Sequence, residues 1–170
     1  AKPKRVIEVG AGWSSLVFEQ ALAANGTRTK YWSVDPYPPE WLASKTTLAK
    51  IVKKPVQAIP LSLFEKLEEN DILFIDSSHV VNTGSDVNTL FLEIIPRLKP
   101  GVIVHVHDIQ LPFEYPKRYA TRQRWFWNEQ YLLQAFLQFN TQFEILVAGH
   151  YLGREEVPFL ESQIPQYDGS

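Results

Sequence analysis

The sequence contains no cysteine, no methionine and no long uninterrupted run of apolar residues. Without cysteine the chain has no disulfides, no thiolate metal sites and no cysteine nucleophile, which fits a reducing cytoplasm, where we expect the protein. No apolar run approaches the roughly 18 residues that a membrane span requires, so we expect no membrane partner. The lack of methionine and the strand-like run Arg5–Val9 close to the start predict the trimmed core of a longer protein.

An excess of one charge is also absent. Seventeen basic residues against nineteen acidic residues leave a formal net charge of −2. This balance creates no overall field that would attract nucleic acid, and we expect no nucleic-acid partner. What the chain has in quantity is apolar residues, 45% of its length against 21% charged, and its 170 residues show no internal repeat. These values are typical of one globular domain.

Short apolar runs alternate with longer amphipathic ones along the chain. The runs that predict strands are Val6–Val9, Tyr31–Val34, Val56–Ile59, Asp71–Ile75, Val102–Val106 and Phe143–Ala148. The stretches that predict helices are Ser15–Ala24, Glu40–Val52, Ser62–Glu69, Ser85–Leu98 and Asn128–Phe139. Strands that alternate with helices imply parallel pairing through right-handed crossovers, so we expect a doubly wound α/β sheet. The domain is expected over residues 1–152, with an irregular tail over 153–170, and Pro96 predicts a kink or an early helix end.

Carboxylate and imidazole side chains gather where the predicted strands end. In a doubly wound sheet the ligand binds beyond the carboxyl ends of the strands, at the point where the strand order reverses. We therefore expect these side chains to line one site. They are Asp35, Asp76, His79, His107, Asp108 and, after the last predicted strand, His150.

The turn after the first predicted strand, Glu8–Gly12, is rich in glycine. Glycines let the backbone turn tightly and approach a ligand closely. Asp35, at the end of the second strand, can accept hydrogen bonds from both hydroxyls of a ribose. A dinucleotide fingerprint has a third glycine where Ser15 stands, and the Glu8 carboxylate would repel a pyrophosphate. A cationic nucleoside such as S-adenosylmethionine suits this turn better.

The ordered set of motifs resembles the class I S-adenosylmethionine-dependent methyltransferases over essentially the whole chain. Glu8-x-Gly10-x-Gly12 matches the first motif of that family, and Asp35 matches its acidic residue after strand two. The run Leu98–Gly101 resembles the family's Leu-Lys-Pro-Gly-Gly. The resemblance implies a Rossmann-like, mostly parallel sheet with S-adenosylmethionine held by Glu8, Gly10, Gly12 and Asp35. It also implies a final antiparallel strand, which we expect to be missing from the given chain.

A narrower resemblance concerns the chemistry. Asp76-x-x-His79 with His107-Asp108 resembles the metal-dependent O-methyltransferases that act on sugars of natural products. That resemblance implies His79 as general base beside Asp76 and Asp108, and a divalent metal such as magnesium on Asp76, His107 and Asp108. Because magnesium prefers oxygen ligands and His107 replaces an acidic residue of that group, a softer metal or no metal stays open.

The function predicted from these residues is S-adenosylmethionine-dependent O-methylation of a polar small molecule, such as a sugar or natural product. Two alternatives stay open, an NAD-dependent oxidoreductase and a catalytically silent nucleoside-binding domain.

The run 116–127 is rich in basic and aromatic residues. It predicts either a cover that binds a polar or anionic small molecule or a solvated loop whose rings pack on the core. The oligomeric state is left open.

Overall fold

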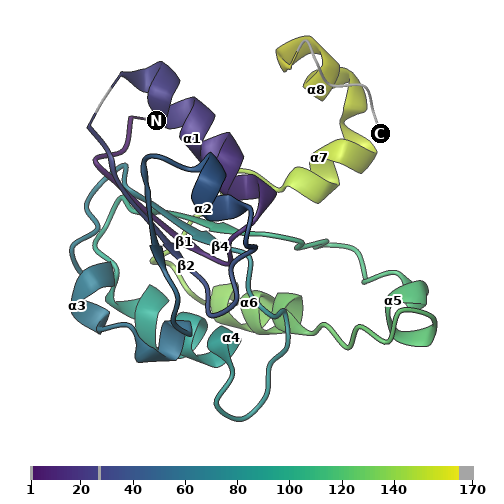
Figure 1. Cartoon of the computed structure of the whole chain (residues 1–170). Coiled ribbons are helices and arrows are strands. Elements are labelled where there is room, and N and C mark those ends of the chain that lie inside the picture. The colour runs from purple at the N-terminus through teal and green to yellow at the C-terminus, as the bar shows by residue number, and fades with distance from the viewer. Residues whose placement is uncertain (1, 27, 165–170) are drawn as a thin grey trace. The chain divides into compact units, whose positions relative to one another are not determined.

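The computed structural model describes residues 2–26 and 28–164, which divide into two compact units between His107 and Asp108. Figure 1 shows the helices and strands of both units. The first unit holds one all-parallel sheet with the strand order β3-β2-β1-β4-β5. Its strands are β1 (Arg5–Val9), β2 (Lys30–Val34), β3 (Ala49–Val52), β4 (Ile72–Ile75) and β5 (Ile103–Val106). This confirms the predicted α/β, doubly wound, Rossmann-like fold class.

Helices flank this sheet. They are α1 (Trp13–Asn25), α2 (Leu42–Lys45), α3 (Leu61–Phe64) and α4 (Asp86–Asn88), the last continued by a π-helical turn over Thr89–Ile94 and a 3₁₀ turn over Ile95–Arg97. Figure 1 shows α1 on one side of the sheet and α3 and α4 on the other. The helical run continues through Pro96 to Arg97, so the early helix end is not found; instead the helical period changes at Ile95, next to Pro96, because proline cannot continue the α-helical hydrogen-bond ladder.

Alternation along β1 determines what faces α1. Val6 packs with Leu22 of α1 and Tyr31 of β2 in one buried cluster. Glu8 lies two residues further on, so it points to the same face and is fully buried there. Ile7 and Val9 are buried on the opposite face. A carboxylate thus lies within the core layer beneath α1, where it requires internal hydrogen-bond donors.

The predicted third strand is wrong. Val56–Ala58 forms a 3₁₀ turn, and the strand is Ala49–Val52, which lies at the end of the predicted helix Glu40–Val52. That helix ends early, since α2 stops at Lys45. The cause is a long-range contact: the Glu19 carboxylate of α1 accepts hydrogen bonds from three successive backbone N–H groups at residues 47–49. These bonds hold the segment extended, where it pairs with β2.

The predicted sixth strand is also wrong. Phe143–Ala148 is irregular, and Ile145, Leu146 and Val147 are exposed. Among the described residues no strand is formed after β5, so the β-branched composition of this segment is not realised in a ladder. His150, expected to follow that strand, lies in a helix instead. The final antiparallel strand is not found among the residues that the structure describes, and residues 165–170 lie outside them.

The second unit contains α5 (Lys117–Thr121), α6 (Glu129–Leu137), α7 (Gly149–Glu155) and α8 (Val157–Gln163). Helix α6 confirms the helix predicted over Asn128–Phe139. The irregular tail is wrong as far as residue 163, because α7 crosses residue 152 and α8 follows, with a proline in its first turn, where proline is tolerated. The domain boundary at 152 stays a prediction. None of the helices in the described ranges is long and apolar enough to span a membrane.

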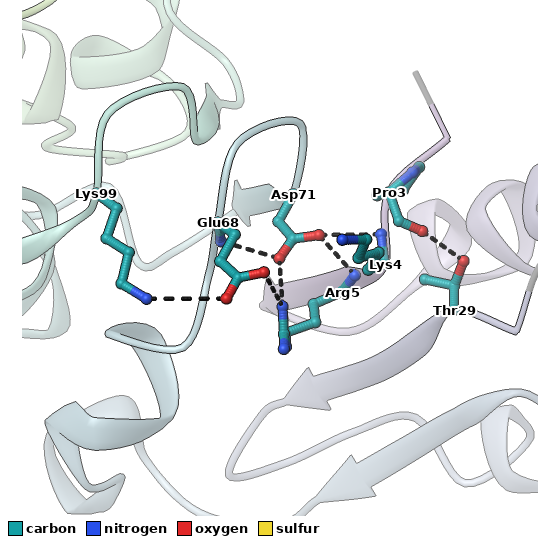
Figure 2. Close-up of polar contacts among 7 residues, drawn as sticks. All are labelled: Pro3, Lys4, Arg5, Thr29, Glu68, Asp71 and Lys99. Carbon is teal, nitrogen blue, oxygen red and sulfur yellow. Dashed lines mark hydrogen bonds and ion pairs between the residues drawn. The ribbon is translucent and has the colours of Figure 1, made fainter.

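The amino ends of β1 and β4 are joined by one buried carboxylate, Asp71 (Figure 2). Its Oδ1 accepts hydrogen bonds from the backbone N–H groups of Lys4 and Arg5 at 2.9 and 2.8 Å. Its Oδ2 accepts from the Glu68 backbone N–H at 2.9 Å and from the Arg5 guanidinium at 3.1 Å. The Arg5 guanidinium also contacts the half-exposed Glu68 carboxylate, which Lys99 approaches to 4.0 Å. This network holds the two central strands at the sheet edge opposite the polar strand ends.

Replacing Asp71 with alanine is therefore expected to destabilise the protein by about 2–4 kcal/mol, because three backbone donors and Arg5 lose their acceptor. The matched control is Glu68→Ala, which removes an exposed carboxylate from the same network and should cost less than about 1 kcal/mol. Urea unfolding followed by circular dichroism measures both. Equal losses for the two variants would contradict the role given to Asp71.

Candidate active site

The glycine turn brings the ends of three strands together. The Gly10 N–H donates to the carbonyl of Val34 at the end of β2, and the Asp76 N–H donates to the carbonyl of Val9. Gly10 has φ = +91°, and a Cβ built there would lie 1.9 Å from the Asp76 carbonyl oxygen. Only glycine fits this position, since both its conformation and its closeness to β4 exclude a side chain. Around Gly12, by contrast, an added Cβ would meet no atom within 4 Å, so this side of the turn is open.

Glu8 holds the start of α1 in place from inside the core. Its carboxylate accepts hydrogen bonds at 2.7 Å from the hydroxyls of Ser14, Ser15, Tyr31 and Ser33. Burial first, and then the Glu8 charge, raise the pKa of Tyr31, which therefore stays protonated and donates. Four donors satisfy a carboxylate that would otherwise be costly to bury. Sequence reasoning missed these hydroxyls as the partners of Glu8, although the alternation of Tyr31 and Ser33 along β2 was a usable signal for two of them.

Asp35 connects the glycine turn to the end of β2. Its Oδ2 accepts a hydrogen bond from the Ala11 backbone N–H at 2.8 Å, and its Oδ1 accepts one from the Tyr37 N–H at 2.6 Å.

An aromatic pair lies beside the glycine turn. Trp13 is 72% exposed, and its ring lies next to that of Trp41, with 5.0 Å between the ring centroids. Sequence reasoning missed this aromatic pair, for which an aromatic residue directly after the glycine turn was the available signal.

Asp76 lies between two histidines beyond the ends of β4 and β5. Its Oδ1 is 3.3 Å from Nε2 of His79 and 3.9 Å from Nδ1 of His107. The Asp76 side chain is 37% exposed and that of His107 is 44% exposed, whereas the His79 residue is only 5% exposed. His79 has φ = +59° and Asp108 has φ = +57°, conformations that L residues adopt at a cost and that recur at functional sites.

A group that could hold a metal is present among these residues. Asp76, His107 and Asp108 can each direct one ligand atom so that the three lie within 4.8 Å of one another. The predicted metal ligands are thus brought together, while their metal binding and the catalytic roles of Asp76, His79 and Asp108 stay predictions. So do the cofactor contacts of Glu8, Gly10, Gly12 and Asp35.

A parallel sheet of this order, with a glycine turn after β1 and a carboxylate after β2, defines a Rossmann-like domain whose site lies at the carboxyl ends of its strands. Residues 7–109, more than half of the chain, match the family model described as a methyltransferase domain, and the chain belongs to that family. Membership implies S-adenosylmethionine as the methyl donor of the family.

One curated relative adds little about activity. A protein of Archaeoglobus fulgidus, described as an uncharacterized protein, is 33% identical over 81 residues, which is 42% of this chain and 34% of the relative. The chain therefore spans about a third of the length of that relative. No solved structure matches the chain.

Proposed function

We propose that the protein is an S-adenosylmethionine-dependent O-methyltransferase that acts on a hydroxyl of a polar small molecule, such as a sugar or another natural product. The observation that carries the proposal is the position of Asp76, which lies between His79 and His107 beyond β4 and directly contacts the glycine turn through its backbone. This arrangement puts proton-accepting groups beside the turn that the family uses for its cofactor.

The residues of the turn fit a sulfonium nucleoside. When bound, S-adenosylmethionine supplies an electrophilic methyl group. Each Asp35 oxygen accepts one backbone N–H and keeps further lone pairs, so the carboxylate can also accept from ribose hydroxyls. The open space beside Gly12 allows the backbone to be approached closely. Glu8 is fully buried and bonded to four hydroxyls, so we assign it to shaping the turn from within.

His79 is the proposed general base. A hydroxyl acceptor must lose a proton as it attacks, and a neutral imidazole accepts one near neutral pH. Asp76 Oδ1, 3.3 Å from His79 Nε2, would stabilise the imidazolium that forms and orient the ring. The low exposure of His79 means that an acceptor would reach it through a close-fitting approach rather than from open solvent.

Asp76, His107 and Asp108 are the proposed holders of a divalent metal. A metal there would lower the pKa of the acceptor hydroxyl and orient it. Two carboxylates and one imidazole form a mixed set of oxygen and nitrogen donors, which suits magnesium less well than a set of oxygen donors alone.

Two alternative functions make different predictions. An NAD-dependent oxidoreductase lacks support from the family, whereas a silent binding domain predicts cofactor binding with no methyl transfer to any acceptor.

Calorimetric titration with S-adenosylhomocysteine tests the cofactor assignment. Asp35→Ala is expected to weaken binding about 10- to 150-fold, because two charged hydrogen bonds to the ribose would be lost. Glu40→Ala, which removes an exposed carboxylate in the same connection after β2, is the matched control and should bind as the parent protein does. Unchanged affinity in folded Asp35→Ala would contradict the assignment, and NAD binding in place of S-adenosylhomocysteine would favour the oxidoreductase.

A further inference from the structure

The second unit contains an aromatic pocket that the proposed methyl transfer does not use. Its volume is about 280 Å³, and the residues that line it lie within positions 115–131. The rings that line it are Tyr115, Tyr119, Trp125, Phe126, Trp127 and Tyr131. Single exposed apolar residues are common on protein surfaces, but a contiguous group of rings such as this one is typical of a contact surface.

The rings are held in a defined arrangement. Trp125 and Trp127 are nearly parallel, with 15° between their planes and 4.8 Å between their centroids. Tyr119 meets both edge-on, at 5.1 and 5.2 Å. The backbone N–H of Trp125 donates to the Tyr119 carbonyl at 2.7 Å, which folds the loop back onto α5. Rings fixed in this way lose little conformational freedom when a ligand binds.

Part of this stack is left open to a ligand. Trp125 is 42% exposed and Phe126 is 66% exposed. Tyr115 also lines the pocket, and burial raises the pKa of its hydroxyl. That hydroxyl is shielded from solvent and has no hydrogen bond of standard geometry within the described ranges, although the Gln130 backbone lies near it. A polar group of a ligand would satisfy that hydroxyl.

Positive charge surrounds the rings. Lys117 lines the pocket, and the Arg118 guanidinium lies over the Tyr119 ring at 5.4 Å. Arg122 and Arg124 follow in the same loop, and all four cations are exposed. In the described part of the chain none of the four forms an ion pair with a carboxylate. Because these cations are not paired, they would repel a cationic ligand from the aromatic pocket and attract an anionic one.

We propose that this pocket, whose lining residues all belong to the second unit, binds an anionic small molecule that carries a flat ring, of the nucleoside monophosphate class. The ring stacks on the indole of Trp125, as bases stack on aromatic side chains elsewhere. Lys117 and the neighbouring arginines attract the phosphate.

Calorimetric titration with uridine monophosphate tests the proposal, with S-adenosylhomocysteine present at saturation so that the glycine turn is not available to the probe. Trp125→Ala should weaken binding about 5- to 150-fold, the range that one base–aromatic stack contributes. Trp125→Phe should restore most of it, and Lys117→Gln should lower both the affinity and its dependence on salt. Phe139→Ala, which removes a fully exposed ring of the same unit, and Lys66→Gln are the matched controls.

Three further probes separate the ring from the charge. Uridine and inorganic phosphate should each bind at least about tenfold more weakly than uridine monophosphate, because each lacks one of the two recognised groups. Glucose 6-phosphate binding as tightly as uridine monophosphate would overturn the assignment of a flat ring. No binding of uridine monophosphate at millimolar concentration, or an unchanged dissociation constant in folded Trp125→Ala, would overturn the proposal. Loss of S-adenosylhomocysteine binding alone would concern only the proposed function.

Discussion

Replacing His79 with asparagine is expected to lower methyl transfer about 10²- to 10⁴-fold, the loss typical of removing a positioned general base. Asparagine suits the comparison because His79 has φ = +59°, a conformation that asparagine tolerates better than most residues. Its amide still forms hydrogen bonds but accepts no proton near neutral pH. Release of S-adenosylhomocysteine measures turnover, once a panel of sugar and phenolic hydroxyl compounds has given an acceptor.

The control for His79→Asn is His107→Asn, because both histidines lie near Asp76. His107→Asn removes the more exposed imidazole and should retain more activity than His79→Asn, unless a metal is required. A chelator separates these cases, because a metal held by Asp76, His107 and Asp108 would make the parent enzyme sensitive to chelation. If His79→Asn lowers only the melting temperature while the folded enzyme turns over normally, His79 is a structural residue. A larger loss in His107→Asn, without chelator sensitivity, would make His107 the base.

The parts of the site that follow strand ends could be predicted from the sequence. In a parallel sheet the carboxyl ends of neighbouring strands meet at one edge, so placing β1, β2, β4 and β5 also placed the residues that follow them. Asp76 and His107 are an example: they are far apart in sequence, yet the pairing of β4 with β5 brings them within 3.9 Å. The local hydrophobic pattern was sufficient there because both strands are short, mostly apolar runs bounded by turns.

The local sequence pattern could not reveal long-range contacts that override the propensity of a segment for helix or strand. Residues 47–49 appear helical by their surroundings, but the Glu19 carboxylate on α1 binds their N–H groups and holds them extended. The partners of the Glu8 carboxylate are a second example, because the hydroxyls of Tyr31 and Ser33 that donate to it come from the neighbouring strand. In both cases a single buried or bridging carboxylate decides the local structure, and its partners lie too far along the chain for a window of sequence to reveal them.

The two glycines of the turn should respond very differently to the same added methyl group. Gly10→Ala is expected to cost more than about 3 kcal/mol, since a left-handed φ alone costs alanine about 1–2 kcal/mol and the Asp76 carbonyl 1.9 Å from the new Cβ must also move. At this chain length that corresponds to a fall of at least about 6 °C in Tm. Binding of S-adenosylhomocysteine should be lost with it, because the displaced turn carries Gly12 and the Ala11 N–H that donates to Asp35.

Gly12→Ala is the matched variant, because its backbone is extended and its new Cβ meets no atom within 4 Å. It should keep Tm within a few degrees of the parent while weakening S-adenosylhomocysteine about tenfold or more, if the cofactor approaches the backbone there. Differential scanning calorimetry and isothermal titration measure the two effects separately. A stable, tightly binding Gly12→Ala would remove Gly12 from the cofactor contacts. A stable Gly10→Ala would show that β1 and β4 can separate at this edge, and that the turn does not depend on the close packing of Gly10 against Asp76.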